Sequence, residues 1–249
     1  MIEGMENVEV SLLGRFEVRV DGEIVPAAAW THARARDLVK LLALAPGHRL
    51  SRDRVVEELW PQFGIDAGLA NLHKAAHHGR RALGHTGGVV LREGQVMLAP
   101  EARVETDVER FEASLDPELY IGELLPDDHY AAWAEEKRAA LRARYLDGLR
   151  TAERWEELAD EEPADEPAQR AVMRARLAAG DRPGALRAFE RLSAALEALA
   201  LRPSVDTLAL YARIAGGTAS TTRSQQSNRR SRRRPWRSER SFSPLARTC

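Results

Sequence analysis

AGLANLHKAAHHGRRALGHTGGVVLR, residues 67–92, is the stretch of sequence that decides the fold, and it contains no acidic residue. Asp66 precedes it and Glu93 follows it, in a chain that is elsewhere rich in carboxylates. Four of the seven histidines lie here, together with four cations: Lys74, Arg80, Arg81 and Arg92. Because a carboxylate would repel phosphate, a surface that binds a polyanion requires such a positive helix without acidic neighbours. The stretch therefore predicts a surface that binds nucleic acid.

Residues 67–83 are predicted to form a helix with two unlike faces, ending at Gly84. At about 100° per residue, one face is a buried stripe of Leu72, Ala76, Gly79 and Leu83. Arg80 lies beside this stripe. The opposite side carries the polar residues Asn71, Lys74, His77, His78 and Arg81. The strand after the helix ends at Arg92, at the tip of a predicted hairpin.

A helix with this arrangement can enter the major groove of DNA, where Asn and Arg contact base edges and Lys contacts bases or phosphate. We therefore predict that DNA is contacted by Asn71, Lys74, His77, His78, Arg80, Arg81 and Arg92. For the helix taken alone, a solvated basic surface is an equal alternative. Because the histidines gain charge toward pH 6, DNA affinity is predicted to increase as the pH falls from about 8 to 6.

The residues before this helix predict a small sheet and two further helices. Three short strands are expected at Val8–Leu13, Phe16–Val20 and Glu23–Val25, with a turn at Asp21-Gly22. A first helix is expected to begin after an N-cap at Thr31 and to end at Pro46-Gly47. A second begins after an N-cap at Ser51 and ends at Pro61.

The residues after it predict a β-hairpin and then a helical domain. Val89–Arg92 and Gln95–Leu98 flank the two-residue turn Glu93-Gly94. The order of strands, three helices and a hairpin is that of a winged helix-turn-helix. No strands are expected after Pro100. Helices follow, with breaks at Gly180-Asp181 and Arg202-Pro203, in the manner of a paired-helix repeat.

The predicted fold is therefore mostly α: an N-terminal winged helix-turn-helix (α+β), then an all-α domain of helical repeats like tetratricopeptide repeats. The expected domains are residues 1–103, which bind DNA, residues 104–216, which are helical, and residues 217–249, a disordered Arg- and Ser-rich tail. The core of the helical domain is expected to include Trp133, Trp155, Tyr130, Tyr145 and Phe189.

Charge is distributed unevenly along the 249 residues, although the net formal charge is -1. Residues 1–100 hold 12 Lys or Arg and 12 Asp or Glu, whereas residues 101–216 hold 16 and 25. Residues 217–249 hold nine Arg and one Glu. The acidic side of 105–166 is either a solvated surface or a docking surface for a partner such as RNA polymerase. The tail either adds nonspecific DNA affinity or is a frayed or out-of-frame segment.

Several classes of protein are disfavoured by the sequence. The single cysteine, Cys249, gives no disulfide framework, and no signal peptide or membrane-spanning apolar run is present, so a cytoplasmic, nucleoid-associated location is expected. Without a phosphate-binding loop or a nucleophile elbow, neither catalysis nor a cofactor is predicted. His73 and His77 have the i, i+4 spacing of zinc ligands, but no cysteine is near and Lys74 adds unfavourable charge, so no metal site is predicted.

Two parts of the sequence resemble a known family, the SARP-type (antibiotic regulatory protein) activators of actinobacteria. The resemblance runs from Val8-Glu-Val-Ser-Leu-Leu-Gly through Leu50-Ser-Arg-Asp-Arg-Val-Val-Glu-Glu-Leu-Trp-Pro and the helix from Ala70 to Gly84. It continues in motifs of the bacterial transcriptional activation domain: Gly122-Glu-Leu-Leu-Pro, Trp133-Ala-Glu-Glu-Lys-Arg, Ala164-Asp-Glu-Pro-Ala-Gln-Arg-Ala-Val-Met and Gly180-Asp-Arg-Pro-Gly-Ala-Leu. Together these cover about residues 8–215.

The resemblance implies an OmpR-type winged helix and a transcriptional activator. Such an activator binds direct repeats in promoter DNA as a side-by-side homodimer and helps RNA polymerase to engage. The sequence departs from the family where Gly79 replaces the usual Leu, between Phe111 and Tyr120, where the chain is shorter, and at Ala152–Pro163, which is abridged. Two alternatives therefore stay open: a helical-repeat protein-interaction module, and a decayed activator with little DNA binding.

Overall fold

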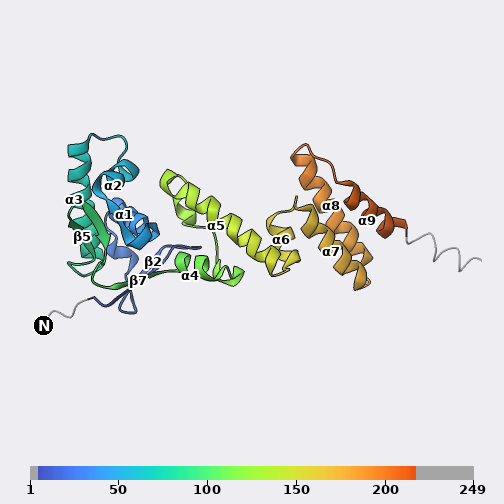
Figure 1. The fold of residues 1–249 in the computed structure, drawn as a ribbon, viewed down its shortest axis with the longest axis horizontal. Helices are drawn as coiled ribbons and strands as arrows, with labels where there is room; N and C mark the ends of the chain where they lie inside the picture. Colours follow the sequence, from blue (N-terminus) through green and yellow to red (C-terminus); the bar gives the residue numbers. More distant parts are fainter. Residues whose placement is uncertain (1–4, 217–249) are drawn as a thin grey trace, which may run out of the picture. The chain divides into compact units, whose positions relative to one another are not determined.

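The computed structural model describes residues 5–216 of the chain (Figure 1). Its contacts divide the chain into two compact units, Met1–Arg154 and Trp155–Cys249. Residues 104–154 thus belong to the first unit, together with the winged helix. The assignment of DNA binding to residues 1–103 remains a prediction. The predicted disorder of residues 217–249 concerns a segment outside the described residues. Within residues 5–216, no helix is long and apolar enough to span a membrane.

The first unit begins with a four-stranded sheet in the order β3-β2-β1-β7. Strands β1 (Asn7–Ser11), β2 (Glu17–Val20) and β3 (Glu23–Ile24) are antiparallel, as predicted. The predicted turn at Asp21-Gly22 lies between β2 and β3, and its positive φ values of 48° and 85° are those of a type I′ turn. The prediction that strands stop after Pro100 was wrong, because β7 (Arg103–Thr106) pairs parallel with β1. A four-residue strand whose partner lies far away along the chain leaves no local hairpin signal.

Three helices follow, α1 (Ala33–Leu44), α2 (Arg52–Leu59) and α3 (Ile65–Ala82). The N-cap of α2 is Ser51, which accepts a hydrogen bond from the Arg54 N–H, as predicted. The N-cap of α1 is His32 rather than Thr31; the Thr31 hydroxyl instead lies 3.1 Å from the His32 ring. Short 3₁₀ turns flank α1 at Ala27–Ala29 and Pro46–His48.

The end of α3 and the wing match the sequence prediction. Gly84 follows the helix with φ of 71°, and the His85 and Gly84 N–H groups donate to the carbonyls of Arg80 and Arg81, which forms a Schellman motif. Strands β5 (Val89–Arg92) and β6 (Gln95–Leu98) are joined by the turn Glu93-Gly94, whose φ values of 52° and 77° are those of type I′. A short strand that was not predicted, β4 (Arg49–Ser51), pairs with the far side of β6. In Figure 1, α3 lies alongside β5.

Residues 104–154 join the winged helix through polar contacts. The Asp107 carboxylate, at the start of α4 (Asp107–Ser114), accepts hydrogen bonds of 2.9–3.0 Å from the N–H groups of Leu12 and Leu13, just after β1. The residues after β1 also exchange backbone hydrogen bonds with Glu123 and Leu125. The Gly-Glu-Leu-Leu-Pro motif is therefore packed against the N-terminal sheet.

Two 3₁₀ turns, Pro117–Leu119 and Pro126–Asp128, lead into the long helix α5 (Ala132–Thr151). Trp133 and Tyr145 are partly buried against the core, and Tyr145 stacks on Tyr120 with ring centroids 4.4 Å apart. The expectation of a core position was wrong for Tyr130, whose side chain is fully exposed. It lies in a loop before α5, where helical periodicity gives no information.

The second unit consists of α6 (Trp155–Glu161), α7 (Glu166–Ala178), α8 (Arg182–Ala198) and α9 (Val205–Gly216). Helix α6 has only seven residues, in line with the abridged repeat expected there. Asp181 caps α8, and Gly180 before it has φ of 80°, so the predicted break is confirmed. Glu166 at the start of α7 accepts hydrogen bonds from Ser204 and Thr207, which ties α7 to the start of α9.

Candidate nucleic-acid interface

The predicted faces of α3 are present in the structure. Leu72, Ala76 and Gly79 are buried, and Ala75 and Ala82 extend the same stripe. Lys74, His77 and Arg81 are exposed, and Asn71 and His78 at the edges are half-buried. The exposed side of α3 therefore presents positive and hydrogen-bonding groups without a carboxylate from residue 67 onward.

Arg80 and Arg92 lie apart from this group. The Arg80 guanidinium donates to the Val89 carbonyl at 2.9 Å, so this side chain attaches α3 to the wing. Arg92 is exposed at the end of β5, beside the wing turn. Arg80 thus positions the two elements relative to each other, while Arg92 is free to approach a ligand. The sequence placed Arg80 beside the buried stripe but gave no sign of the bond to Val89.

The histidines of α3 form a cluster with a histidine that the sequence analysis did not single out. The His78 ring stacks on His32, with centroids 3.4 Å apart and an angle of 14° between the planes. His77 meets the edge of His78 at 5.3 Å. Partial burial, together with the nearby His32, His77 and Arg81, lowers the pKa of His78 below its ordinary value. The stack fixes His78 against the start of α1, while His77 stays exposed.

Two glycines set how closely α3 approaches its neighbours. A Cβ on Gly68 would lie 2.3 Å from Val56 Cγ1, so any side chain there would clash with α2. A Cβ on Gly79 would lie 3.1 Å from Val89 Cγ2 in the wing. Gly79 therefore has a packing role, because Val89 leaves little room for a side chain at this position. The missing Leu does not leave the core of this winged helix incomplete, because Leu72, Ala76 and Val89 are all buried.

The wing is also anchored to the start of α2, a contact that was not predicted. The Arg52 N–H donates to the Gly94 carbonyl at 2.9 Å, so the first residue of α2 holds the wing turn. The sequence predicts the start of α2 from its N-cap, Ser51, but it does not predict the bond from Arg52 to the wing. The positions of α2, α3 and the wing tip are thus linked by backbone and side-chain hydrogen bonds.

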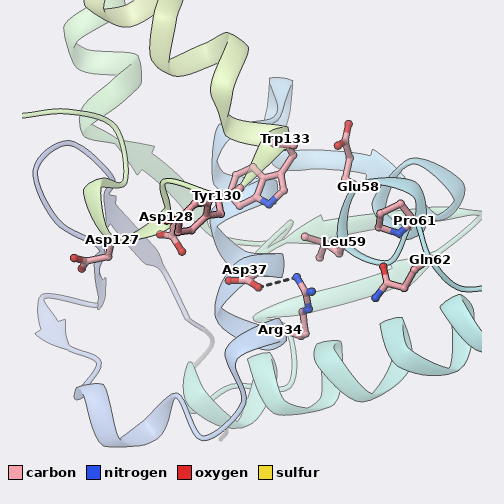
Figure 2. A pocket seen from close by; sticks show the side chains of 12 residues that line it. Arg34, Asp37, Glu58, Leu59, Pro61, Gln62, Asp127, Asp128, Tyr130 and Trp133 are labelled. Carbon is pink, nitrogen blue, oxygen red and sulfur yellow. Dashed lines mark hydrogen bonds and ion pairs between the residues drawn. The ribbon is translucent and has the colours of Figure 1, made fainter.

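A pocket of about 400 Å³ lies elsewhere in the first unit, between α1, the end of α2 and the loop before α5 (Figure 2). Its polar lining is mainly acidic: Asp37, Glu58, Asp127 and Asp128, with Arg34 paired to Asp37. Burial raises the pKa of Asp37, although the charges of Lys40 and Arg34 oppose this. These carboxylates make the pocket unsuited to phosphate.

Beneath this pocket, a buried ion pair joins α1 to the loop. The Lys40 side chain is 2% exposed, and its Nζ lies 2.6 Å from Asp128 Oδ2 and 4.8 Å from the centre of the Phe16 ring. The sequence gave no sign that Lys40 would be buried, nor of its partner Asp128. Within residues 5–216, no three His, Cys, Asp or Glu side chains lie close enough together to hold a metal ion.

A comparison with solved structures finds Mycobacterium tuberculosis EmbR, in a complex with a low-affinity phosphopeptide. The similarity has a TM-score of 0.59 at 18% sequence identity, and covers 84% of this chain and 65% of the EmbR chain. This chain thus corresponds to less than two thirds of that one. The likeness shows the fold, and it confirms the predicted architecture of a winged helix followed by a helical domain. Neither a protein-family model nor a curated protein matches the chain.

Proposed function

We propose that this chain is a sequence-specific DNA-binding transcriptional regulator, namely a promoter-binding activator that helps to recruit RNA polymerase. The observation that carries the proposal is the exposed face of α3, where Lys74, His77 and Arg81 lie together without an acidic neighbour. With 18 residues, α3 is about 27 Å long, and an α-helix fits the major groove of B-DNA. The proposal includes no catalytic activity and no cofactor.

The proposed contacts divide into two kinds. Asn71, Lys74, His77, His78 and Arg81 face the major groove from α3. Arg92, at the tip of the wing, contacts a phosphate or an adjacent groove. Arg80 is proposed to act through its bond to Val89, by holding the wing at the correct distance from α3. The chain is proposed to act in the cytoplasm, on promoter DNA and as a homodimer.

The alternatives are a protein-docking role for the winged helix and a decayed activator. The packing of α3 favours DNA binding, because a decayed domain would not be expected to keep both the Schellman motif and the wing anchor at Gly94. A protein-docking surface is typically apolar at its centre. The exposed face of α3 has Lys74 and Arg81 at its centre instead.

The test is DNA binding by the double variant Lys74→Ala with Arg81→Ala, measured by fluorescence anisotropy on DNA from upstream of neighbouring genes. Removal of these two cations should weaken specific binding by about 1–3 kcal/mol for each side chain that touches a base. Each phosphate that the variant no longer neutralises should reduce the slope of log K against log salt by about 0.9. The matched control is Arg174→Ala with Arg187→Ala, two exposed cations of the helical unit, which should bind like the unmodified chain. Unchanged affinity and salt slope in the α3 variant would rule out the proposal.

A further inference from the structure

The pocket shown in Figure 2 takes no part in the proposed DNA binding. It has a volume of about 400 Å³, within the roughly 300–1,000 Å³ of pockets that hold small molecules. Three separate segments line it: the first half of α1, the end of α2 with the residues after it, and the loop that leads into α5. A ligand in this pocket would therefore contact the winged helix and residues 104–154 at the same time.

Two aromatic side chains form part of the lining. Tyr130 is fully exposed, and Trp133 is only partly buried. Figure 2 shows both rings on one side of the pocket, with Leu59 and Pro61 on the other. The walls thus offer aromatic rings and an aliphatic surface to an apolar body. A ligand with such a body would cover apolar area that is now in contact with water, which favours binding.

Carboxylates outnumber cations in the lining of the pocket. Arg34 is its one cation, whereas its carboxylates are Asp37, Glu58, Asp127 and Asp128. Asp127 is exposed and has no ion-pair partner within residues 5–216. The ion pairs of Asp37 and Asp128 each use the Oδ2 atom, so each of these carboxylates keeps a second oxygen for a ligand. The pocket therefore favours a positive ligand over a negative one.

Asp37 shows that the cations already present do not fully compensate these carboxylates. Its Oδ2 accepts a hydrogen bond of 3.2 Å from Arg34. Burial nevertheless raises the pKa of Asp37, and the charge of Asp128 adds to this rise, while Lys40 and Arg34 oppose it. A further positive charge in the pocket would reduce the cost of keeping Asp37 ionised. The electrostatics and the shape of the pocket thus favour the same class of ligand.

The ligand that fits is an organic cation rather than a metal ion. Among the described residues, no three His, Cys, Asp or Glu side chains are grouped closely enough to hold a metal. Aromatic rings instead suit an ammonium group that carries an apolar body, because a cation is attracted to the face of a ring. We propose that this pocket binds a small organic cation. Its ammonium group lies among the carboxylates, and its apolar body lies against Tyr130, Trp133 and Leu59.

The test is an NMR titration of the ¹⁵N-labelled full chain with phenethylammonium, phenethyl alcohol and phenylpropanoate, which carry similar apolar bodies but different charges. Trp133→Phe identifies the indole N–H signal of Trp133. That signal should shift saturably with phenethylammonium, which should bind about tenfold more tightly than the alcohol, because only the cation gains from the carboxylates and the rings. Phenylpropanoate should not bind. The signal of Trp155, which does not line the pocket, should stay unchanged.

Two variants change exposed side chains of the pocket and leave the buried Lys40–Asp128 pair intact. Asp127→Asn and Tyr130→Ala should each weaken the binding of phenethylammonium about three- to fivefold. Because both side chains are exposed, the amide spectra should otherwise match that of the unmodified chain. Glu101→Gln changes an exposed carboxylate outside the pocket, so it is the matched control for Asp127→Asn and should bind normally.

Three results would overturn the proposal: no saturable shift at Trp133, equal binding of phenethylammonium and phenethyl alcohol, or normal binding by both pocket variants. A pocket used only by a Lys or Arg side chain of a larger partner would give the first of these results. The proposal is independent of DNA binding. Lys74→Ala with Arg81→Ala should still bind phenethylammonium, so failure of the DNA-binding proposal would be seen separately.

Discussion

At the scale of single residues, the histidines of α3 differ in what they can contribute to binding. His78 stacks on His32, and its lowered pKa keeps it neutral to lower pH than an ordinary histidine. His77 is exposed beside Lys74 and Arg81. The sequence placed both histidines on one face as equal partners, since a helical wheel contains no information about α1. In the structure His78 is stacked against the start of α1, whereas His77 is exposed on the side of α3 that is proposed to meet DNA.

We therefore predict that DNA affinity rises as the pH falls from about 8 to 6, and that this rise depends on His77. His77→Gln should flatten the curve of affinity against pH, whereas His78→Gln should leave its shape unchanged. Anisotropy titrations at constant ionic strength would measure both. An equal loss of pH dependence in the two variants would contradict this assignment.

The same pKa shift has a consequence for stability. Because the pKa of His78 is lower in the folded chain than its usual 6.5, the unfolded chain takes up the proton first. The stability that His78 contributes is thus present above about pH 6.5 and is lost as the pH falls below it. We therefore expect the contact between α3 and α1 to weaken as the pH falls below about 6.5.

At the scale of elements, α3 packs closely against α2 and the wing because Gly68 and Gly79 have no side chains. Gly79 costs about 1 kcal/mol of helix propensity relative to Ala, but it admits Val89. We predict that Gly79→Leu lowers the free energy of unfolding by about 1–3 kcal/mol through overpacking against the wing. Gly79→Leu with Val89→Ala should recover most of the loss, as measured by urea unfolding. If Gly79→Leu alone were stabilising, the packing role given to Gly79 would be wrong.

The elements that could be predicted from sequence are those specified by neighbouring residues. The wing was predicted to the residue, because Glu93-Gly94 fixes the turn and the strands alternate around it. The Ser51 cap and the end of α3 at Gly84 are equally local. Strand β7 and the cap of α1 were not predicted correctly. The pairing of β7 with β1 joins residues about 96 positions apart, such as Asn7 and Arg103, and no local pattern encodes such a partner.

The candidate site shows the same limit. The exposed and buried faces of α3 follow from a period of 3.6 residues, and the structure has them as predicted. The bond from Arg80 to Val89 and the stack of His78 on His32 depend on other elements, so periodicity alone could not supply them. Whether Asn71, Lys74, His77, His78, Arg80, Arg81 and Arg92 contact DNA stays a prediction.

At the scale of the whole molecule, contacts from residues beyond 103 complete the winged helix. Truncation there would remove most of β7, the Asp107 bonds to the end of β1, and Asp128, which would leave Lys40 buried without its partner. Removing one partner of a buried ion pair costs about 3–5 kcal/mol, out of the 5–15 kcal/mol that typically stabilise a protein.

We therefore predict that a fragment of residues 1–103 is largely unfolded and binds DNA poorly, whereas residues 1–154 fold and bind like the full chain. Circular dichroism and anisotropy on the two fragments would measure this. The sequence-based boundary at 103/104 was placed at the end of the hairpin. In the structure, the β1–β7 pairing and the Lys40–Asp128 pair connect residues on the two sides of that boundary. Native-like folding and full affinity of residues 1–103 would contradict the role given to these contacts.

The Lys40–Asp128 pair also bears on how the chain matures during synthesis. Lys40 leaves the ribosome long before Asp128, and β1 long before β7, so the nascent N-terminal part cannot complete its core until that later segment has emerged. A polypeptide released early by a stalled ribosome would carry the whole of α3 and yet lack a stable scaffold to present it. If α3 binds promoters as proposed, we expect truncated translation products to be poor competitors for them, because the buried Lys40 ammonium group lacks its partner until Asp128 has been made.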